Sequence, residues 1–158
     1  MNLYHGSKFH HTQLMPGFKR TKVEKNWDNT ESNKFLYATV EAQPAVGMGF
    51  ASALDQSFML KRFQHNDDVI RITIEEGPVP TKEDLAKIKV YLYTILYRQI
   101  DGWEKANNAH NNMSGEFRTA KTIKEAITNI RPYSMEDWLA KKKVTVIAPL
   151  GKPGWSGW

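Results

Sequence analysis

A stripe of small side chains between residues 42 and 57 constrains the fold of this chain more than any other feature. The stripe lies in EAQPAVGMGFASALDQSFMLKRF, residues 41–63, a stretch whose pattern is helical despite Gly47 and Gly49. Its members are Ala42, Ala45, Val46, Gly49, Ala53 and Ser57. Residues three and four apart share one face of a helix, so the spacing predicts a helix over 41–63. Because these side chains are so small, we expect that helix to lie close against a sheet.

Short runs of β-forming residues surround the predicted helix. Residues 3–5 and 35–40 precede it, and VTVIAPL at 144–150 provides a terminal strand. DVIRITIEEG at 68–77 alternates between two faces and closes at a Gly-Pro pair, which predicts a strand.

Residues 81–100 fit two interpretations. Thr81 and Asp84 resemble a capping box ahead of apolar residues at helical spacing, whereas 90–97 is dense in β-formers. SMEDWLAKKK at 134–143 predicts a short helix, because Ser134 stands at the N-cap position, acids follow it and lysines end the segment.

The order of these elements indicates a fold class. Strands and helices interleave without a regular βαβ rhythm, which predicts a single compact α+β domain over residues 1–150. We expect a mixed or antiparallel sheet with flanking helices, and a Gly- and Trp-containing tail at 151–158. Polar segments at 15–34 and 107–115 predict long loops, which are often functional in compact domains.

The composition excludes several classes of protein. The chain has 158 residues and no cysteine, which removes disulfide frameworks, thiolate zinc sites and cysteine nucleophiles. No apolar run approaches the ~18–20 residues that a membrane-spanning helix needs. The first residues lack the pattern of a secretory signal, so we expect a cytoplasmic protein without a membrane partner.

The charge is mildly basic. A formal net charge of +5 favours phosphates, nucleic acids or acidic proteins at long range. The excess is small and its lysines are dispersed along the chain. Solubilising side chains are therefore the simpler interpretation, and nucleic-acid binding remains the alternative.

Most standard catalytic and metal-binding signatures are absent. There is no Walker loop, and GMGFAS lacks the third glycine of a dinucleotide-binding fingerprint. His10 and His11, with His65, Asp67 and Asp68, have no spacing typical of a metal site, so we expect no bound metal.

Three short motifs, in a fixed order, resemble the ADP-ribosyltransferase superfamily. LYHGS lies near the start, FLYAT opens the small-residue helix, and GEFRT follows a polar loop. Together they are similar to the branch with a His–Tyr–Glu triad. The resemblance spans residues 3–119 and implies a cleft that binds NAD between His5-Gly6, Tyr37 and Glu116.

The resemblance implies a role for each of these positions. The backbone at Gly6 would grip the nicotinamide carboxamide, and His5 would bind a ribose hydroxyl. Tyr37 would stack on nicotinamide, with Phe50 as the nearest aromatic for the opposite wall, since Met48 stands where the family usually has an aromatic. Glu116 would hold the ribose 2′-hydroxyl and stabilise the charge that develops as the glycosidic bond breaks.

The expected activity is therefore that of an NAD-consuming glycosyltransferase, which moves ADP-ribose to a macromolecular acceptor (protein or nucleic acid) and releases nicotinamide. The alternatives are a non-catalytic binder of a nucleotide or signal molecule on the same fold, and a small basic nucleic-acid-binding domain.

Each of these site residues also has a purely structural interpretation. His5 fits the end of a strand, Tyr37 fits a core position, and Glu116 fits a solvated surface. Glu136 is a competing acid, but its place in the first turn of a predicted helix already accounts for it.

Overall fold

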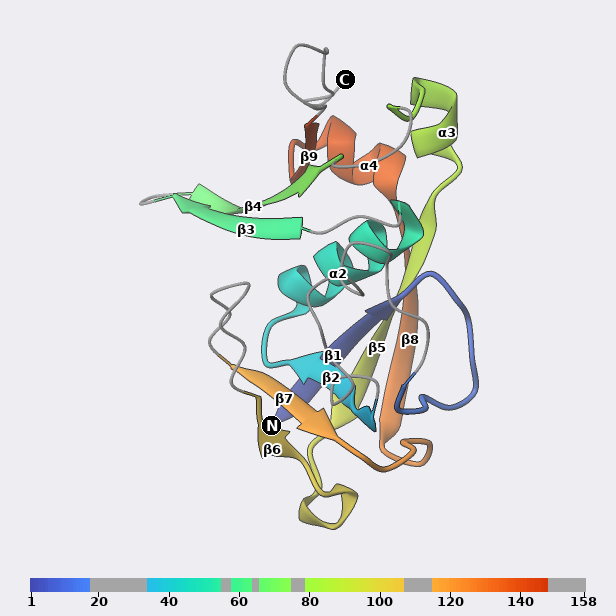
Figure 1. Ribbon diagram of the computed structural model, residues 1–158, viewed down its shortest axis with the longest axis vertical. Coiled ribbons are helices and arrows are strands. Elements are labelled where there is room, and N and C mark those ends of the chain that lie inside the picture. Colours follow the sequence, from blue (N-terminus) through green and yellow to red (C-terminus); the bar gives the residue numbers. More distant parts are fainter. Residues whose placement is uncertain (18–33, 55–57, 64–65, 75–78, 107–114, 148–158) are drawn as a thin grey trace.

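The chain folds into two β-sheets and three helices (Figure 1), within the residues that the structure describes. This structure is a computed structural model, and it describes residues 1–17, 34–54, 58–63, 66–74, 79–106 and 115–147. The mixture of helices with mostly antiparallel strands confirms the α+β class predicted from the sequence.

The larger sheet has six strands in the described part of the chain, and every neighbouring pair is antiparallel. In spatial order they are β6 (Glu104–Lys105), β7 (Glu116–Thr119), β2 (Leu36–Thr39), β1 (Asn2–Ser7), β5 (Lys89–Leu96) and β8 (Ile127–Ser134). The first strand of the chain therefore lies in the middle of the sheet, which is why LYHGS is held on both sides.

The smaller sheet contains β3 (Phe58–Phe63), β4 (Asn66–Thr73) and β9 (Val144–Ile147). Strands β3 and β4 are antiparallel, whereas β9 returns from the far end of the chain to pair in parallel with β4. The helices are α2 (Ala42–Leu54), α3 (Lys82–Ala86) and α4 (Met135–Ala140).

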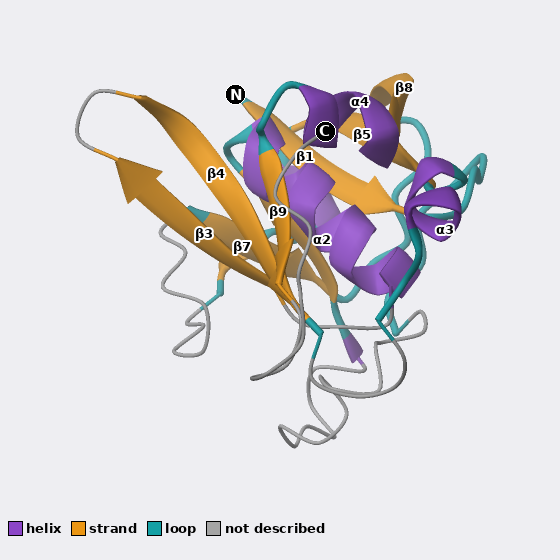
Figure 2. Ribbon diagram, turned by 90° about the horizontal axis from the view of Figure 1, so that it is seen from above, coloured by secondary structure: helices purple, strands orange, loops and turns teal. Residues whose placement is uncertain are grey.

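Helix α2 lies between the two sheets, as the views in Figures 1 and 2 both show. It touches β1 so closely that a Cβ atom added at Gly6 would lie 1.8 Å from the main-chain oxygen of Ala45. A Cβ at Gly49 would come within 3.1 Å of Val90 Cβ. The predicted close contact between a small-residue helix and a sheet is confirmed.

The predicted extent of that helix is wrong at its C-terminal end. Helix α2 ends at Leu54, and residues 58–63 form strand β3 rather than continuing the helix. Their backbone groups pair with β4, and a tertiary ladder of this kind overrides local helical spacing.

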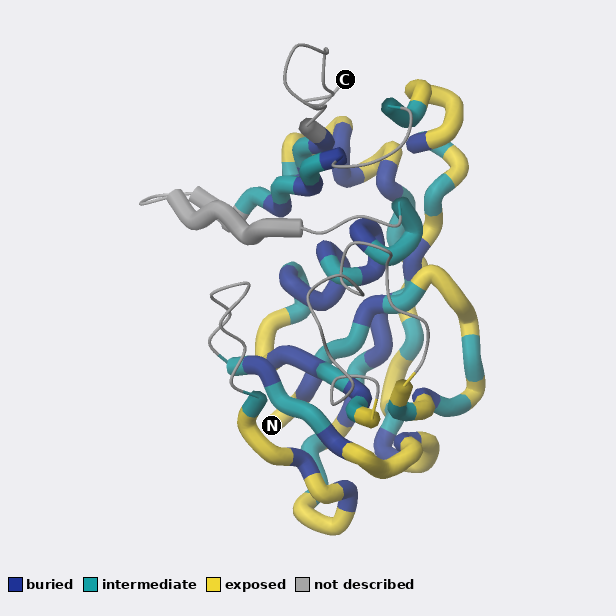
Figure 3. The backbone as a smooth tube through the Cα atoms, viewed as in Figure 1, coloured by how far each residue is buried: buried dark blue, intermediate teal, exposed yellow. Residues whose placement is uncertain are grey.

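Two hydrophobic cores lie on opposite faces of the larger sheet, and Figure 3 shows the buried positions along α2 and the inner strands. The core around α2 contains Ala45, Val46, Phe50, Ile70, Ile72, Ile74, Leu85, Val90, Leu92, Met135, Trp138, Leu139, Val144 and Val146. The core on the other face contains Leu3, Leu14, Leu36, Ala38, Tyr93, Ile95, Trp103, Ile123 and Ala126. Alternate residues of β1 and β5 therefore pack into different cores.

The helical and the strand interpretation of residues 81–100 are each confirmed for one part of the segment. Thr81 and Asp84 form the capping box and begin α3, which ends at Ala86, and the β-rich remainder becomes strand β5. Ser134 caps α4 through a hydrogen bond from the backbone N–H of Asp137, as predicted.

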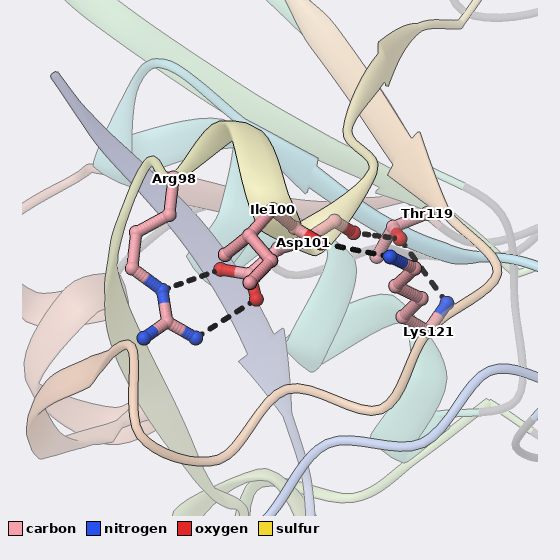
Figure 4. A network of polar contacts seen from close by, with 5 residues as sticks. All are labelled: Arg98, Ile100, Asp101, Thr119 and Lys121. Carbon is pink, nitrogen blue, oxygen red and sulfur yellow. Dashed lines mark hydrogen bonds and ion pairs between the residues drawn. The ribbon is translucent and has the colours of Figure 1, made fainter.

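A tight turn after β5 is held by a network of polar contacts (Figure 4). The Arg98 guanidinium donates two hydrogen bonds, of 2.9 and 2.8 Å, to the carboxylate of Asp101, which is only 6% exposed. Thr119 donates to the main-chain oxygen of Asp101, and the Lys121 ammonium donates to that of Ile100. These bonds tie the turn to the end of β7.

Candidate functional site

His5 is held by the main chain of the neighbouring strand. Its Nδ1 lies 2.7 Å from the carbonyl oxygen of Tyr37. A carbonyl only accepts, so Nδ1 carries the proton and donates it. In the neutral ring this leaves Nε2 as a hydrogen-bond acceptor, and no described residue donates to it.

Burial keeps this imidazole neutral. Desolvation lowers the pKa of His5 from its ordinary 6.5, and the hydrogen bond to the Tyr37 carbonyl opposes that effect without cancelling it. At neutral pH the ring therefore presents one fixed tautomer. A single acceptor nitrogen of this kind suits a hydroxyl donor, such as a ribose hydroxyl.

The contact between His5 and Tyr37 is made where β1 and β2 stop pairing. In the described ladder Tyr4 and Thr39 are directly opposed, and no further pair follows. The imidazole then satisfies the β2 carbonyl that a continuing ladder would have used. The predicted neighbours do meet, but through ring and backbone rather than through two side chains.

The register of β2 with β7 brings Tyr37 and Glu116 to one face of the sheet. Tyr37 lies opposite Arg118, and Thr39 lies opposite Glu116. Directly opposed residues of antiparallel strands point to the same side, and alternate residues of one strand do too. These four side chains, Tyr37, Thr39, Glu116 and Arg118, form what we call the β2–β7 polar face.

His5 points to the other side of the sheet. It lies opposite Tyr93 in β5, with the two ring centroids 6.1 Å apart, and Tyr93 belongs to the core that also holds Leu3. The sheet therefore brings Tyr37 and Glu116 together on one face, while His5 reaches them only through the Tyr37 carbonyl.

Glu116 is one of the largest fully buried side chains in the described part of the protein, with 2% of its surface exposed. It opens strand β7 directly after Gly115, which has a φ of +85° that other residues rarely adopt. The Gly115 carbonyl accepts a hydrogen bond from the Val40 amide and so fixes the start of the strand. This placement excludes the solvated-surface interpretation of Glu116.

Two of the expected site residues have packing roles. The place of a side chain at Gly6 is filled by the Ala45 carbonyl of α2, so contact with the helix already requires glycine there. Phe50 has no exposed surface and packs edge-on against Trp138, with centroids 5.7 Å apart. Its ring presents no face to a ligand, which argues against the expected role of Phe50 as a stacking wall.

Arg118 belongs to the same face but was missed from the sequence. Its guanidinium lies 4.2 Å above the centre of the Phe35 ring, and Nε donates a 2.7 Å hydrogen bond to Glu104 of β6. Burial lowers the pKa of Arg118, but hydrogen bonds to the side chains of Glu104 and Tyr37 outweigh this and raise it. The signal was present in GEFRT, because residues two apart in a strand share a face.

Several other predicted features carry no site in the described structure. His10 stacks on Tyr91 with ring centroids 4.9 Å apart, and the His11 amide donates to the Tyr93 hydroxyl, so both help fold the segment after β1 onto β5. Glu136 is exposed in the first turn of α4, as its helix-dipole interpretation requires.

The remaining sequence-based expectations fall on residues outside the described ranges. These include residues 18–33 of the polar segment, the loop at 107–114, His65 and the tail at 151–158. Across the described ranges, no three His, Asp or Glu side chains gather in a group that would hold a metal ion. None of the described helices is both long and apolar enough to cross a membrane.

Comparison of the chain with protein-family models, with curated proteins and with solved structures found no match. A functional assignment therefore depends on the three ordered motifs and on the geometry of the residues that they contain. The β2–β7 polar face and the His5 contact are the parts of that geometry with chemical consequences.

Proposed function

We propose that the protein binds NAD on a fold of the ADP-ribosyltransferase type and transfers ADP-ribose to a macromolecular acceptor. The observation that carries this proposal is the burial of Glu116 on the face that also holds Tyr37. Carboxylates are seldom fully buried in proteins, and one held away from water is suited to stabilising a developing cation.

The reaction places charge where this carboxylate would act. The bond between ribose C1′ and the nicotinamide nitrogen breaks, and its electron pair leaves with nicotinamide. Positive charge develops on the ribose, and a nucleophile of the acceptor then bonds to C1′ and loses its proton. Glu116 would bind the 2′-hydroxyl and stabilise the cationic ribose, an interaction strengthened by exclusion of water.

Tyr37 would bind the nucleotide, and His5 would position it from the other face of the sheet. The Nδ1 of His5 donates to the Tyr37 carbonyl and so holds this part of β2 in place. The half-buried ring of Tyr37 would pack on the nicotinamide. Phe35 lies edge-on to Tyr37, with centroids 6.5 Å apart, and restricts its orientation.

A non-catalytic nucleotide binder is the second candidate, and the placement of Phe50 favours it. With Phe50 in the core, only Tyr37 remains of the two expected aromatic walls around nicotinamide. A binder needs no such sandwich and no carboxylate at the reacting carbon. It would bind ADP-ribose or NAD without releasing nicotinamide.

Nicotinamide release from NAD, with cell extract as the source of acceptor, tests these two candidates. We expect release by the wild type and its loss in Glu116→Gln, while Glu136→Gln, which removes an exposed acid on α4, keeps full activity. Thermal unfolding of each variant shows whether the loss comes from chemistry rather than from misfolding.

The other results are also decisive. Binding of NAD without release would establish the second candidate. Release that survives in Glu116→Gln would refute the role of this carboxylate, and an absence of both binding and release would refute the proposal.

A further inference from the structure

The guanidinium of Arg118 is held in place by two neighbours. Its central carbon lies 4.2 Å from the centre of the Phe35 ring, and its Nε donates to the Glu104 carboxylate at 2.7 Å. Tyr37 of β2 lies directly opposite Arg118 in the sheet. An arginine fixed in this way loses little conformational entropy when it binds a ligand.

Part of the Arg118 guanidinium is accessible. The side chain is 30% exposed, and a guanidinium has five N–H donors, more than the bond to Glu104 uses. Planar donors of this kind match the oxygens of a phosphate group in pairs. The site is therefore ready for an anion that approaches the β2–β7 polar face.

The internal partner of Arg118 is easily displaced. The Glu104 side chain is 54% exposed and makes one hydrogen bond, through Oε1, to Nε. Exposed ion pairs contribute little free energy, because water and salt screen them. An incoming phosphate would exchange one anionic partner of Arg118 for a better-matched one.

The position of Arg118 relative to Glu116 indicates what kind of anion it would meet. The two residues are two apart in β7 and share a face, so their Cα atoms are separated by about 7 Å along the strand. In NAD the pyrophosphate is joined to the ribose that carries nicotinamide. A ligand whose ribose lies at Glu116 therefore brings its phosphates close to Arg118.

We propose that Arg118 anchors the pyrophosphate of the bound nucleotide, and that Glu104 occupies the guanidinium until phosphate displaces it. This inference rests on the proposed function for the identity of the ligand. It adds a positively charged specificity residue and a competing internal carboxylate to the proposed site. Removal of the Glu104 carboxylate should therefore tighten nucleotide binding, whereas binding would stay unchanged if the ion pair were purely structural.

Calorimetric titration with ADP-ribose and with inorganic pyrophosphate tests the inference. For Arg118→Gln we expect affinity for both ligands to fall by about tenfold or more, as for the loss of a charged hydrogen bond. Arg131→Gln is the matched control, because it removes another arginine that lies over an aromatic ring, on the exposed part of β8. Its affinity should change by less than about twofold.

The competing carboxylate has its own pair of variants. Glu104→Gln should tighten binding of both ligands by about twofold to fivefold, since it removes an exposed ion pair. Asp137→Asn is its control, because it removes a similarly exposed acid from an ion pair with Lys141. Arg118→Lys keeps the charge but loses the planar donors, so it should fall between wild type and Arg118→Gln.

Each contrary result has a defined meaning. Equal weakening by Arg118→Gln and Arg131→Gln would reduce the effect to net charge and overturn the inference, as would unchanged or weaker binding in Glu104→Gln. If the wild type releases nicotinamide but Arg118→Gln binds normally, the inference fails and the proposed function stands. If pyrophosphate binds through Arg118 without any NAD turnover or NAD binding, the anion site stands and the proposed function fails.

Discussion

Replacement of Gly6 by alanine should destabilise the fold severely, because it drives a methyl group into the backbone of α2. The added Cβ would lie 1.8 Å from the Ala45 oxygen and 2.6 Å from the Ala45 carbonyl carbon, far inside the closest real contacts. Neither backbone atom can rotate away, so the helix has to retreat by about an ångström from the sheet. Overpacking of this kind costs about 3 kcal/mol.

In a domain of this size that cost lowers the melting temperature by about 6–12 °C. Thermal and urea unfolding followed by circular dichroism would measure it, with Gly49→Ala as the matched control on the opposite side of the same contact. A Cβ at Gly49 meets its nearest neighbours at 3.1 to 3.3 Å, and alanine gains about 1 kcal/mol of helix propensity there. A Gly6→Ala protein that melts within about 2 °C of wild type would refute the reasoning.

Three further predictions follow from the polar contacts. Tyr93→Phe removes the hydroxyl that joins β5 to the segment after β1, and urea unfolding should show a loss of about 1–2 kcal/mol; an unchanged midpoint would contradict it. The pKa of His5 is lowered in the folded protein, so the unfolded chain binds a proton more readily and stability should fall as the pH drops below about 6.5. His5→Asn keeps a donor for the Tyr37 carbonyl but cannot be protonated, so the melting temperature of this variant should fall less over the same pH range. Arg98→Ala should lower the melting temperature, because it leaves the carboxylate of Asp101 without its cation. Adding Asp101→Asn to Arg98→Ala should recover part of that loss, and a double mutant no more stable than Arg98→Ala would contradict a stabilising role for the pair.

Local sequence signals predicted the elements whose ends are set by their own side chains. The Thr81–Asp84 capping box begins α3, and Ser134 begins α4, because both interactions close within a few residues. The stripe that contains Ala45 and Gly49 predicted the close contact of α2 with a sheet for a similar reason, since small size and spacing are visible in the chain itself.

Long-range pairing decided what the sequence could not. Residues 58–63 continue an acceptable helical pattern, and only the ladder with β4 makes them a strand. Phe50 was expected at a ligand for want of another aromatic nearby, yet its neighbour Trp138 is far along the chain and makes it a core residue. Periodicity within one segment contains no information about such partners.

In the candidate site too, local sequence predicted some features and long-range pairing decided the others. Chemical type and order were enough to select Tyr37 and Glu116, which the register of β2 with β7 places on one face. The side of the sheet on which His5 lies depends on its pairing with β5, which the motif LYHGS does not contain. Arg118 was overlooked because its partners Phe35 and Glu104 become neighbours only after β2, β7 and β6 assemble.

The parallel pairing of β9 with β4 has a consequence for synthesis of the chain. Strand β4 ends at Thr73 and its partner begins at Val144, so the edge that β9 covers stays bare while about 70 residues are translated. At about 5–20 residues per second this lasts several seconds. During that time Ile70 and Ile72 of β4 are presented on an unpaired apolar edge, a known template for aggregation. Growth temperature and chaperone supply should therefore govern the yield of soluble protein, although the finished fold buries Val144 and Val146 of β9 in the core around α2.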